Sequence, residues 1–352
     1  MLKRAGAVII CIISTVYANS FDLLQQLQSS RDYSKLIQIA DSLIHAGVDS
    51  AWVKAFEGRA YADLGQYDNA LPYLKSVYES PQNIPKWLWA WNTFYLGKTY
   101  LFKKETEKAT ALFKEVIETR ITKNVVAEAN RYMNVVPNSP FYKQWTKIET
   151  RNFNFLFHKK TKLRSPQEFA QKMQLVFDTI NVFFNAEIPG KIDFFVWNNN
   201  VQFPGTPKYP GGFAIPELLI VHSRYMQTPG HEMTHIITHY AVDTVKYISA
   251  IINEGVATLF NMTHVNRIEE ARKHLSGQSI SIEELWKSDL AFRKLPSQLS
   301  YSLAAAFVEH LLAEGNKENF HKLLSDQSWS NAQNIYGDKL AEMIDGFWSR
   351  LN

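Results

Sequence analysis

Two histidines and a glutamate lie together in one short segment of the sequence, His231-Glu232-Met233-Thr234-His235. A helix turns by about 100° per residue, so histidines four positions apart lie on one face and both can reach a single metal ion. Glu232 lies beside that face, where its carboxylate can take a proton from a water molecule held by the metal. The segment predicts a zinc hydrolase in which His231 and His235 bind the metal and Glu232 is the general base.

Glu254, in Asn253-Glu254-Gly255, is the candidate for the third metal ligand. It lies in an apolar stretch, Tyr247 to Phe260, which predicts a buried helix. A carboxylate in such surroundings needs a partner, and a divalent cation is one. Gly255 would let this helix and the helix of the two histidines approach closely. The alternative is a glutamate on a solvated helix face. With Glu254 included, the sequence predicts a site for one Zn²⁺.

The residues around the histidines favour a helix with one buried side. Thr228 can cap it and Pro229 suits its first position. An apolar stripe at helical spacing points away from the two histidines and comprises Met233, Ile236, Ile237 and Tyr240. The helix should therefore bury one side in a core and turn the histidines toward a cleft.

His239 is a competing ligand because it follows His235 by four residues. At 1.5 Å rise per residue it lies roughly 12 Å along the axis from His231, which is too far for both to bind one ion at about 2 Å. We therefore do not expect His239 to be a ligand. Its alternatives are a hydrogen bond to the site or the role of an ordinary, partly exposed histidine.

These residues resemble the gluzincin metallopeptidases, in which His-Glu-x-x-His on one helix is completed by a glutamate on the next. Eighteen residues separate His235 from Glu254 here, and Asn253-Glu254-Gly255-Val256-Ala257 is similar to the second zinc helix of such peptidases. The resemblance implies that His231, His235 and Glu254 bind zinc and that Glu232 polarises the water. It extends, more weakly, from about Phe153 to the carboxyl terminus.

Two further expectations follow from the resemblance. In similar enzymes an edge strand before the metal helix pairs with substrate backbone. The matching segments of this sequence are Gly211 to Ala214 and Leu218 to Val221. Glu217 does not reproduce the amine-binding motif of aminopeptidases, which favours an endopeptidase or oligopeptidase. Tyr301 is similar in placement, at the start of a long helix, to a tyrosine that donates to the oxyanion. The alternative for Tyr301 is a packed aromatic.

The amino-terminal part, from Phe21 to about Val136, has helical spacing throughout and contains a repeat. Gly58-Arg59-Ala60-Tyr61 aligns with Gly97-Lys98-Thr99-Tyr100 at an offset of 39 residues. The turn Leu64-Gly65-Gln66-Tyr67 is similar to that of a tetratricopeptide repeat. Such arrays can bind a protein partner, and the alternative is that this one only packs against the catalytic part.

The remaining pattern predicts an α+β protein. Pro137-Asn138-Ser139-Pro140 breaks the helical spacing, which gives a tetratricopeptide-like domain at 19–140 and a zincin-like metallopeptidase domain at 141–352. Strands are expected at Lys147 to Thr150, Phe153 to His158, Lys191 to Trp197 and Phe213 to Val221, with a helix at Pro166 to Ala186. This is a small mixed sheet flanked by helices and followed by a helical carboxyl-terminal part.

The first 18 residues predict a cleaved signal peptide. Lys3 and Arg4 precede an apolar run, and small residues end it at Ala18. We therefore expect a secreted or periplasmic protein without stable membrane insertion, and an amino-terminal membrane anchor is the alternative. Cys11 is the only cysteine and lies within this segment, so a catalytic cysteine is excluded from the mature chain.

The formal net charge of the chain is only +4, and its lysines and arginines are scattered along the sequence. No nucleic-acid partner is therefore expected. The sequence thus predicts an exported zinc metallopeptidase that acts on a peptide or protein substrate. One alternative is a repeat-based interaction protein whose metallopeptidase-like domain binds zinc with little or no turnover. Another is a zinc hydrolase that acts on a different amide or an ester.

Overall fold

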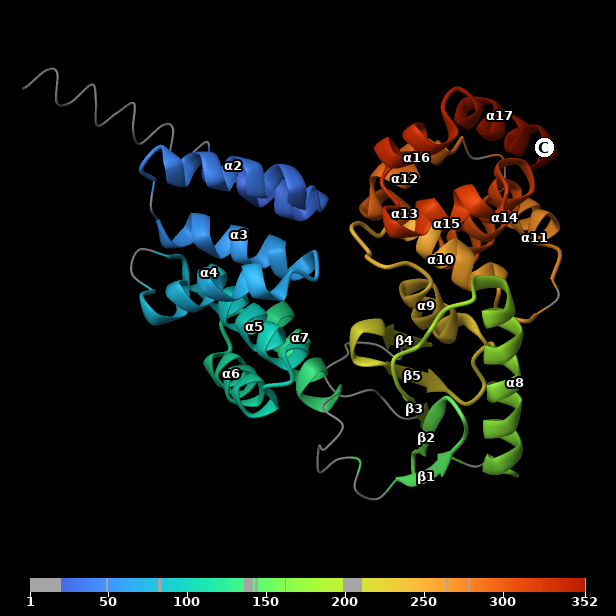
Figure 1. Ribbon diagram of the computed structural model, residues 1–352, viewed down its shortest axis with the longest axis horizontal. Coiled ribbons are helices and arrows are strands. Elements are labelled where there is room, and N and C mark those ends of the chain that lie inside the picture. The colour runs from blue at the N-terminus through green and yellow to red at the C-terminus, as the bar shows by residue number, and fades with distance from the viewer. Residues whose placement is uncertain are drawn as a thin grey trace, which may run out of the picture. The chain divides into compact units, whose positions relative to one another are not determined.

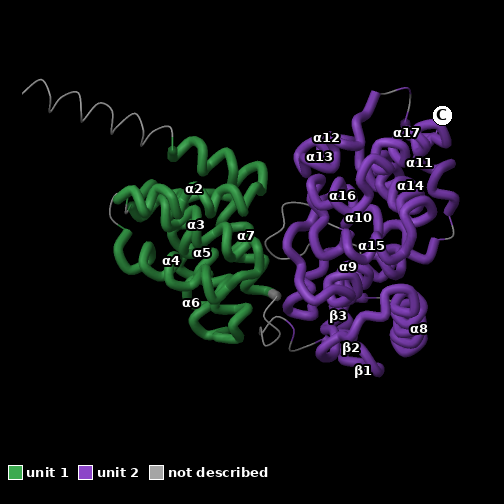
Figure 2. Tube along the Cα trace, turned by 45° about the horizontal axis from the view of Figure 1, so that its top comes forward, with its two compact units in different colours: residues 1–139, 203–208 green, residues 140–202, 209–352 purple. Residues whose placement is uncertain are grey.

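The computed structural model describes residues 20–48, 50–81, 84–135, 142, 145–161, 163–198, 211–263, 265–275, 277 and 279–351. The fold is α+β, with helices up to Val135, then a mixed sheet, and then helices again (Figure 1). Two compact units comprise residues 1–139 with 203–208, and residues 140–202 with 209–352 (Figure 2). The expected signal peptide and the break at Pro137 to Pro140 lie outside the described residues. Among the described helices, none combines the length and apolar character of a membrane span.

Unit 1 is helical, as the sequence predicts. After a helix at residues 20–30 it contains α2 (Tyr33–His45), α3 (Ala51–Asp63), α4 (Tyr67–Glu79), α5 (Lys86–Phe102), α6 (Thr106–Thr119) and α7 (Lys123–Val135). Each helix packs on the next along the chain, and the most extensive contacts are within the pairs α3 with α4 and α5 with α6. The unit is therefore a stack of consecutive helices.

The two copies of the sequence repeat build the same contact. A Cβ atom on Gly58 would lie 2.8 Å from Cγ of Leu74, and one on Gly97 would lie 2.8 Å from Cε1 of Phe113. Leu74 and Phe113 are themselves 39 residues apart. Each glycine therefore lets the first helix of a pair lie directly against a large side chain of the second.

Unit 2 contains a five-stranded sheet with the order β1-β2-β3-β5-β4. Its strands are β1 (Thr146–Glu149), β2 (Phe153–Phe157), β3 (Ile192–Trp197), β4 (Gly212–Ile215) and β5 (Ile220–Arg224). The three inner strands are parallel, and the edge strands β1 and β4 are antiparallel to their neighbours. The sheet is therefore mixed, as expected.

The prediction of one strand from Phe213 to Val221 is wrong. A 3₁₀ turn at Pro216–Leu218 interrupts it, and Leu219 adopts a left-handed φ of 54°. The chain reverses there, so β4 and β5 form a hairpin. Proline has no backbone N–H to donate to a sheet, which explains why the strand ends at this point. Only the first half of the expected strand, β4, lies at the sheet edge.

Both faces of the sheet are covered. On one face, alternate residues of β2 (Phe153, Phe155 and Phe157) share a core with the helices α8 (Pro166–Phe184) and α9 (His231–Tyr240). On the other face, His222 of β5 stacks on Phe195 of β3 and on Phe213 of β4, with ring centroids 4.4 and 4.6 Å apart. The indole Nε1 of Trp197 donates to Nδ1 of His222 over 2.8 Å. These contacts hold β4 and β5 in place before the chain enters α9.

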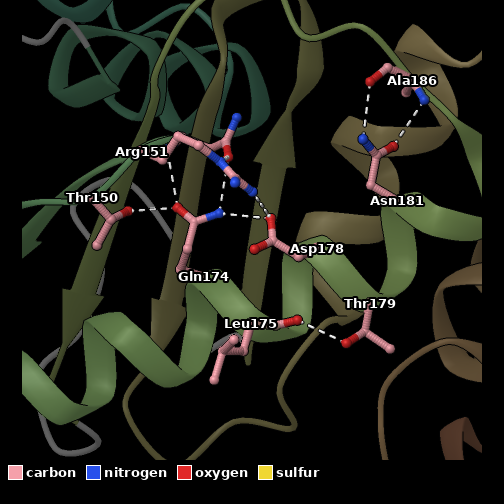
Figure 3. Close-up of polar contacts among 9 residues, drawn as sticks. Thr150, Arg151, Gln174, Leu175, Asp178, Thr179, Asn181 and Ala186 are labelled. Atoms are coloured by element: carbon pink, nitrogen blue, oxygen red, sulfur yellow. Dashed lines mark hydrogen bonds and ion pairs between the residues drawn. The ribbon is translucent and has the colours of Figure 1, made fainter.

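Polar contacts attach α8 to the turn between β1 and β2 (Figure 3). Oε1 of Gln174 accepts from the Thr150 hydroxyl at 2.8 Å, and Nε2 of Gln174 donates to Asp178 at 2.9 Å. Arg151 forms an ion pair with Asp178. Near the carboxyl-terminal end of α8, Asn181 exchanges two hydrogen bonds with the backbone of Ala186. The helix is thereby held at its middle and at its carboxyl-terminal end.

The carboxyl-terminal part is helical. It contains α10 (Ala250–Leu259), α11 (Arg267–Leu275), α12 (Ile282–Lys287), α13 (Asp289–Lys294), α14 (Ser297–Gly315), α15 (Lys317–Ser325), α16 (Trp329–Tyr336) and α17 (Lys339–Leu351). The buried helix α14 packs on α10, α11, α13, α15 and α17. It begins one turn before Tyr301, so the expectation that Tyr301 opens this helix is wrong. The apolar residues of these helices and of the sheet form one core.

Candidate metal centre

The helix α9 begins at His231 and its cap differs from the expected one. The N-cap is Gly230, with a φ of 98°, and neither Thr228 nor Pro229 belongs to the helix. The carbonyl of Gly230 accepts from both the backbone N and the Oγ1 of Thr234, each at 2.8 Å. A Cβ on Gly230 would lie 3.0 Å from Ile180 Cδ1. Only glycine combines this φ with such close packing, and it places His231 in the first turn.

The apolar stripe of α9 is buried as predicted, with Met233, Ile236 and Ile237 inside the core of unit 2. The side chains of His231 and His235 are on the other side of the helix and are 13% and 12% exposed. Both imidazoles are therefore largely buried, on the side of α9 away from the apolar stripe. The separation of the stripe from the histidines is what the residue spacing predicts.

Glu254 is positioned by the anchored start of α10. Just before the helix, the Ser249 N–H donates to Oε1 of Gln327 at 3.1 Å and the Ser249 hydroxyl donates to the carbonyl of Trp286 at 3.0 Å. The Ala250 N–H donates to Oδ1 of Asp289 at 2.9 Å. Three hydrogen bonds to α12, α13 and the loop after α15 therefore fix the helix that carries the carboxylate.

Gly255 packs against a different helix from the one expected. A Cβ at this position would lie 2.6 Å from the carbonyl oxygen of Ala304 and 2.7 Å from Cγ2 of Val308, both in α14. The close approach that Gly255 permits is therefore between α10 and α14 rather than between the two helices of the site.

His231, His235 and Glu254 lie together. Nε2 of His231 is 3.2 Å and Nε2 of His235 is 3.8 Å from Oε2 of Glu254. One ligand atom from each residue can be chosen such that all lie within 4.8 Å of one another. Two imidazole nitrogens and a carboxylate oxygen are donors that fit a divalent transition metal, zinc included, and three protein ligands leave a position open. Among the described residues, His239 does not belong to this group.

The second ring nitrogen of His235, Nδ1, lacks the hydrogen bond that usually orients a metal-binding histidine. Nδ1 of His235 is buried without a hydrogen-bond partner among the described residues. Metal-bound histidines nearly always donate this second N–H to a carboxylate, carbonyl or water, which orients the ring. Here the ring of His235 is held by packing, with the ring of His231 5.1 Å away, edge to face.

Glu232 is buried and is held by a glutamine that sequence reasoning missed. Nε2 of Gln227 donates to Oε1 of Glu232 at 2.7 Å. Oε1 of Gln227 accepts in turn from the Ser223 hydroxyl at 2.9 Å. Gln227 thus links the end of β5 to the candidate base. No periodic or spacing signal indicates this contact, because it depends on how the loop after β5 folds back.

The backbone of the edge strand lies directly against this pair. A Cβ on Gly212 would lie 2.5 Å from Oε1 of Gln227 and 2.8 Å from Oε1 of Glu232. It would also lie 2.5 Å from the carbonyl oxygen of His222. The first residue of β4 therefore must be small for Glu232 and Gln227 to take these positions.

The two carboxylates of the site have pKa values shifted in opposite directions. Burial raises the pKa of Glu232 to about 7, against the charge of His235 and the hydrogen bond from Gln227. Burial also acts to raise the pKa of Glu254, but the hydrogen bond to His231 and the nearby charges of both histidines and Arg293 outweigh it and lower that pKa. The site therefore favours an ionised Glu254 beside a Glu232 that can accept a proton near neutral pH.

Tyr301 lies at the same site. It is 37% exposed, its ring centroid is 5.9 Å from that of His231, and Phe292 supports it at 6.2 Å. Burial raises the pKa of the Tyr301 hydroxyl to about 12, and the charge of Glu254 acts in the same direction. All five residues singled out in the sequence therefore lie in one region of unit 2.

No protein-family model matches the sequence, and no curated protein matches it. The chemistry of this centre is therefore defined by its donor atoms, their distances and the buried carboxylate beside them.

Proposed function

We propose that unit 2 is a single-zinc peptidase of the gluzincin kind, with His231, His235 and Glu254 as the metal ligands. The observation that carries this proposal is the approach of two imidazole nitrogens to one carboxylate, with a second, buried carboxylate next to them. These residues come from two adjacent helices, and the donor set is that of catalytic rather than structural zinc sites.

The residues of the chain then have distinct roles. A bound zinc ion would supply a Lewis acid that polarises the peptide carbonyl and lowers the pKa of water. Glu232 accepts the proton of the attacking water and passes it to the leaving amine. Gln227 holds Glu232 in position for both transfers. The Tyr301 hydroxyl donates a hydrogen bond to the oxyanion that develops on the substrate.

The edge strand β4 is the proposed place for substrate backbone. Its outer side has no neighbouring strand in the described sheet, and its first residue abuts Glu232. An extended peptide can pair with such an edge through its main chain. Glu217 is exposed on the turn after β4. We therefore favour cleavage within peptides over removal of an amino-terminal residue.

The decisive experiment combines metal analysis with cleavage of a mixed peptide library by the purified mature chain. We expect about one zinc per chain and hydrolysis of peptide bonds. Glu232→Gln should retain the metal and lose at least about 100-fold in kcat, because the base is removed and the ligands are not. Glu217→Gln, an exposed glutamate nearby, is the matched control. Undiminished cleavage by Glu232→Gln would refute the role of the base.

A second candidate function is binding without useful turnover. The repeated glycine contacts of unit 1 favour it, because they build the stacked helical pairs of a repeat array. Unit 1 would then be the functional part, as tetratricopeptide-like repeats that bind a protein partner. Stoichiometric zinc with no cleavage of any peptide, amide or ester substrate would establish this alternative. In both cases we propose export directed by residues 1–18.

A further inference from the structure

A cavity of about 550 Å³ in unit 2 is lined by residues of α12, α16 and α17 and of the turn before α17. Of these helices, α16 packs on both of the others (Figure 1). The volume is within the range of small-molecule sites in proteins. His231, His235 and Glu254 are not among the lining residues. The cavity is therefore separate from the candidate metal centre, and an inference about it does not depend on the proposed peptidase function.

Two tryptophans contribute to the lining of the cavity. Trp329 of α16 is half-buried and packs edge to face on the buried Trp286, with ring centroids 5.5 Å apart. Trp348 of α17 is half-buried as well. Ile282 and Leu340, which are 1% and 3% exposed, also line the cavity. The lining therefore combines apolar contact area with two indole rings, and aromatic faces attract cations.

The chain itself places a cation on one of these indoles. Nζ of Lys287 lies 5.2 Å from the ring centroid of Trp329. The same ammonium group forms an ion pair with Glu283, which lines the cavity. The ring and the carboxylate thus act together on one positive charge. This contact indicates the kind of ligand that suits the lining.

Every charged side chain that lines the cavity is acidic. Besides Glu283 these are Asp338 and Asp345, which are exposed and form no ion pair with the residues that the structure describes. Seven residues separate the two aspartates, which corresponds to roughly 10 Å along a helix axis. Ala341 and Ile344 lie between them on the same side of α17 and also line the cavity. The cavity therefore has a carboxylate at each end of an apolar strip.

We propose that this cavity binds an organic dication, a small molecule with two positively charged nitrogens joined by an apolar chain. One nitrogen pairs with Asp338 and the other with Asp345, and the chain between them contacts Ala341 and Ile344. Trp348 follows Asp345 by three residues on the same side of the helix, so its ring contacts the second nitrogen. A cavity of this size takes a small molecule whole, which favours a free diamine over a protein segment.

A series of linear compounds tests the number and the spacing of the charges. Diaminooctane has an amino group at each end and a chain long enough to span the two aspartates. Its bis(trimethylammonium) analogue has no lone pair on nitrogen and cannot bind a metal centre. Octylamine carries one charge, octanediol carries none, and diaminobutane is too short to span the site. Which of the two long dications binds more tightly tells whether N–H donors are required.

We expect calorimetric titration of the full mature chain to show about one site for a long dication and at least about three-fold weaker binding of octylamine and diaminobutane. Asp338→Asn and Asp345→Asn should each weaken binding of the long dication by about three-fold to five-fold, because each removes one exposed charge. Asparagine keeps the ability of Asp338 to cap α17. Glu342→Gln is the matched control, since Glu342 is exposed on α17 but does not line the cavity. It should bind like the unaltered chain.

Equal affinity for octylamine and diaminooctane would overturn the proposal, and equal affinity for octanediol would leave only an apolar pocket. A loss in Glu342→Gln as large as that in Asp345→Asn would mean that the ligand responds to the overall charge of α17 and not to the cavity. The absence of binding by either long dication would also refute the assignment. A peptide with two lysines that bound in their place would assign the cavity to a protein partner instead.

Discussion

At the scale of single residues, the most informative contact is that between Gln227 and Glu232. It joins the end of β5 to the candidate base, and the backbone of Gly212 closes against both side chains. The amide donates to one carboxylate oxygen and leaves the other free to accept a proton. The position of the base is therefore determined by residues that bind no metal.

Replacing Gln227 by leucine removes this hydrogen bond with little change in volume. We expect kcat to fall by about ten-fold to 100-fold, because Glu232 loses its fixed orientation, while zinc content and KM stay the same. Steady-state kinetics with metal analysis test this. A fall in metal content of similar size would instead show that Gln227 supports the whole centre, and an unchanged kcat would contradict the positioning role.

A second buried carboxylate, Glu57 in α3, makes the stability of unit 1 depend on pH. Burial raises its pKa to about 7 from an ordinary 4.5, and neither of its carboxylate oxygens has a hydrogen-bond partner among the described residues. The folded unit therefore binds this proton more tightly than the unfolded chain does. The contribution of Glu57 to stability is therefore fully present below about pH 4.5 and is lost as the pH rises through about 7.

Glu57→Gln should remove this dependence. We expect the variant to be more stable than the unaltered chain by about 1–2 kcal/mol at pH 8 and by much less at pH 5. Denaturant unfolding of unit 1, monitored by hydrogen exchange at pH 5 and at pH 8, measures the difference in stability. Equal effects at both pH values would show that Glu57 is not the titrating group.

At the scale of elements, Gly255 sets the distance between α10, which carries Glu254, and the buried helix α14. The obstacle to a larger residue is the backbone oxygen of Ala304, which no side-chain rotation can move. In unit 1, Gly97 faces the ring of Phe113 instead. The two glycines therefore provide matched positions for substitution by alanine. Gly255 is next to a candidate ligand in the sequence, and Gly97 is remote from the candidate site in the sequence.

Gly255→Ala should destabilise unit 2 by about 2–3 kcal/mol through overpacking and weaken zinc binding, because α10 must shift. Gly97→Ala should destabilise unit 1 and leave zinc affinity unchanged. Unfolding measurements and competitive zinc titration of both variants test this pair. An unaltered zinc affinity in Gly255→Ala would mean that the spacing of α10 and α14 does not govern the ligand geometry.

The helices of the site could be predicted largely from the sequence because apolar residues recur along them with helical spacing, as at Met233, Ile236 and Ile237. The failures have local causes. The residues from Phe213 to Val221 form a nearly continuous apolar run on both sides of Pro216, so the pattern predicts one strand where the chain turns between β4 and β5. Thr228 has a capping side chain, but the left-handed Gly230 starts the helix. The contact of Gln227 with Glu232 depends on the folded hairpin, which no local pattern indicates.

At the scale of the whole molecule, the two compact units have separate roles in the proposals. The described candidate metal ligands all belong to unit 2. A ligand that binds one folded unit stabilises that unit by mass action. Metal binding should therefore protect unit 2 and leave the stability of unit 1 unchanged.

Removal of zinc by a chelator should destabilise unit 2 alone. At a free zinc concentration 100 times the Kd we expect about 2.7 kcal/mol of stabilisation, lost on chelation. Hydrogen exchange resolved along the chain would show faster exchange in α9 and α10 and no change in α3 or α5. The same response in Glu254→Ala would mean that the chelator acts at some other site.

If β4 receives the substrate as proposed, the contact of its backbone with Gln227 and Glu232 would couple recognition to chemistry. A peptide that aligned well along β4 would press on the same backbone that confines the proton acceptor, and a poorly aligned one would not. Preference among peptides should consequently appear in the rate of turnover as well as in affinity. A binding assay alone would then underestimate how selective such an enzyme is.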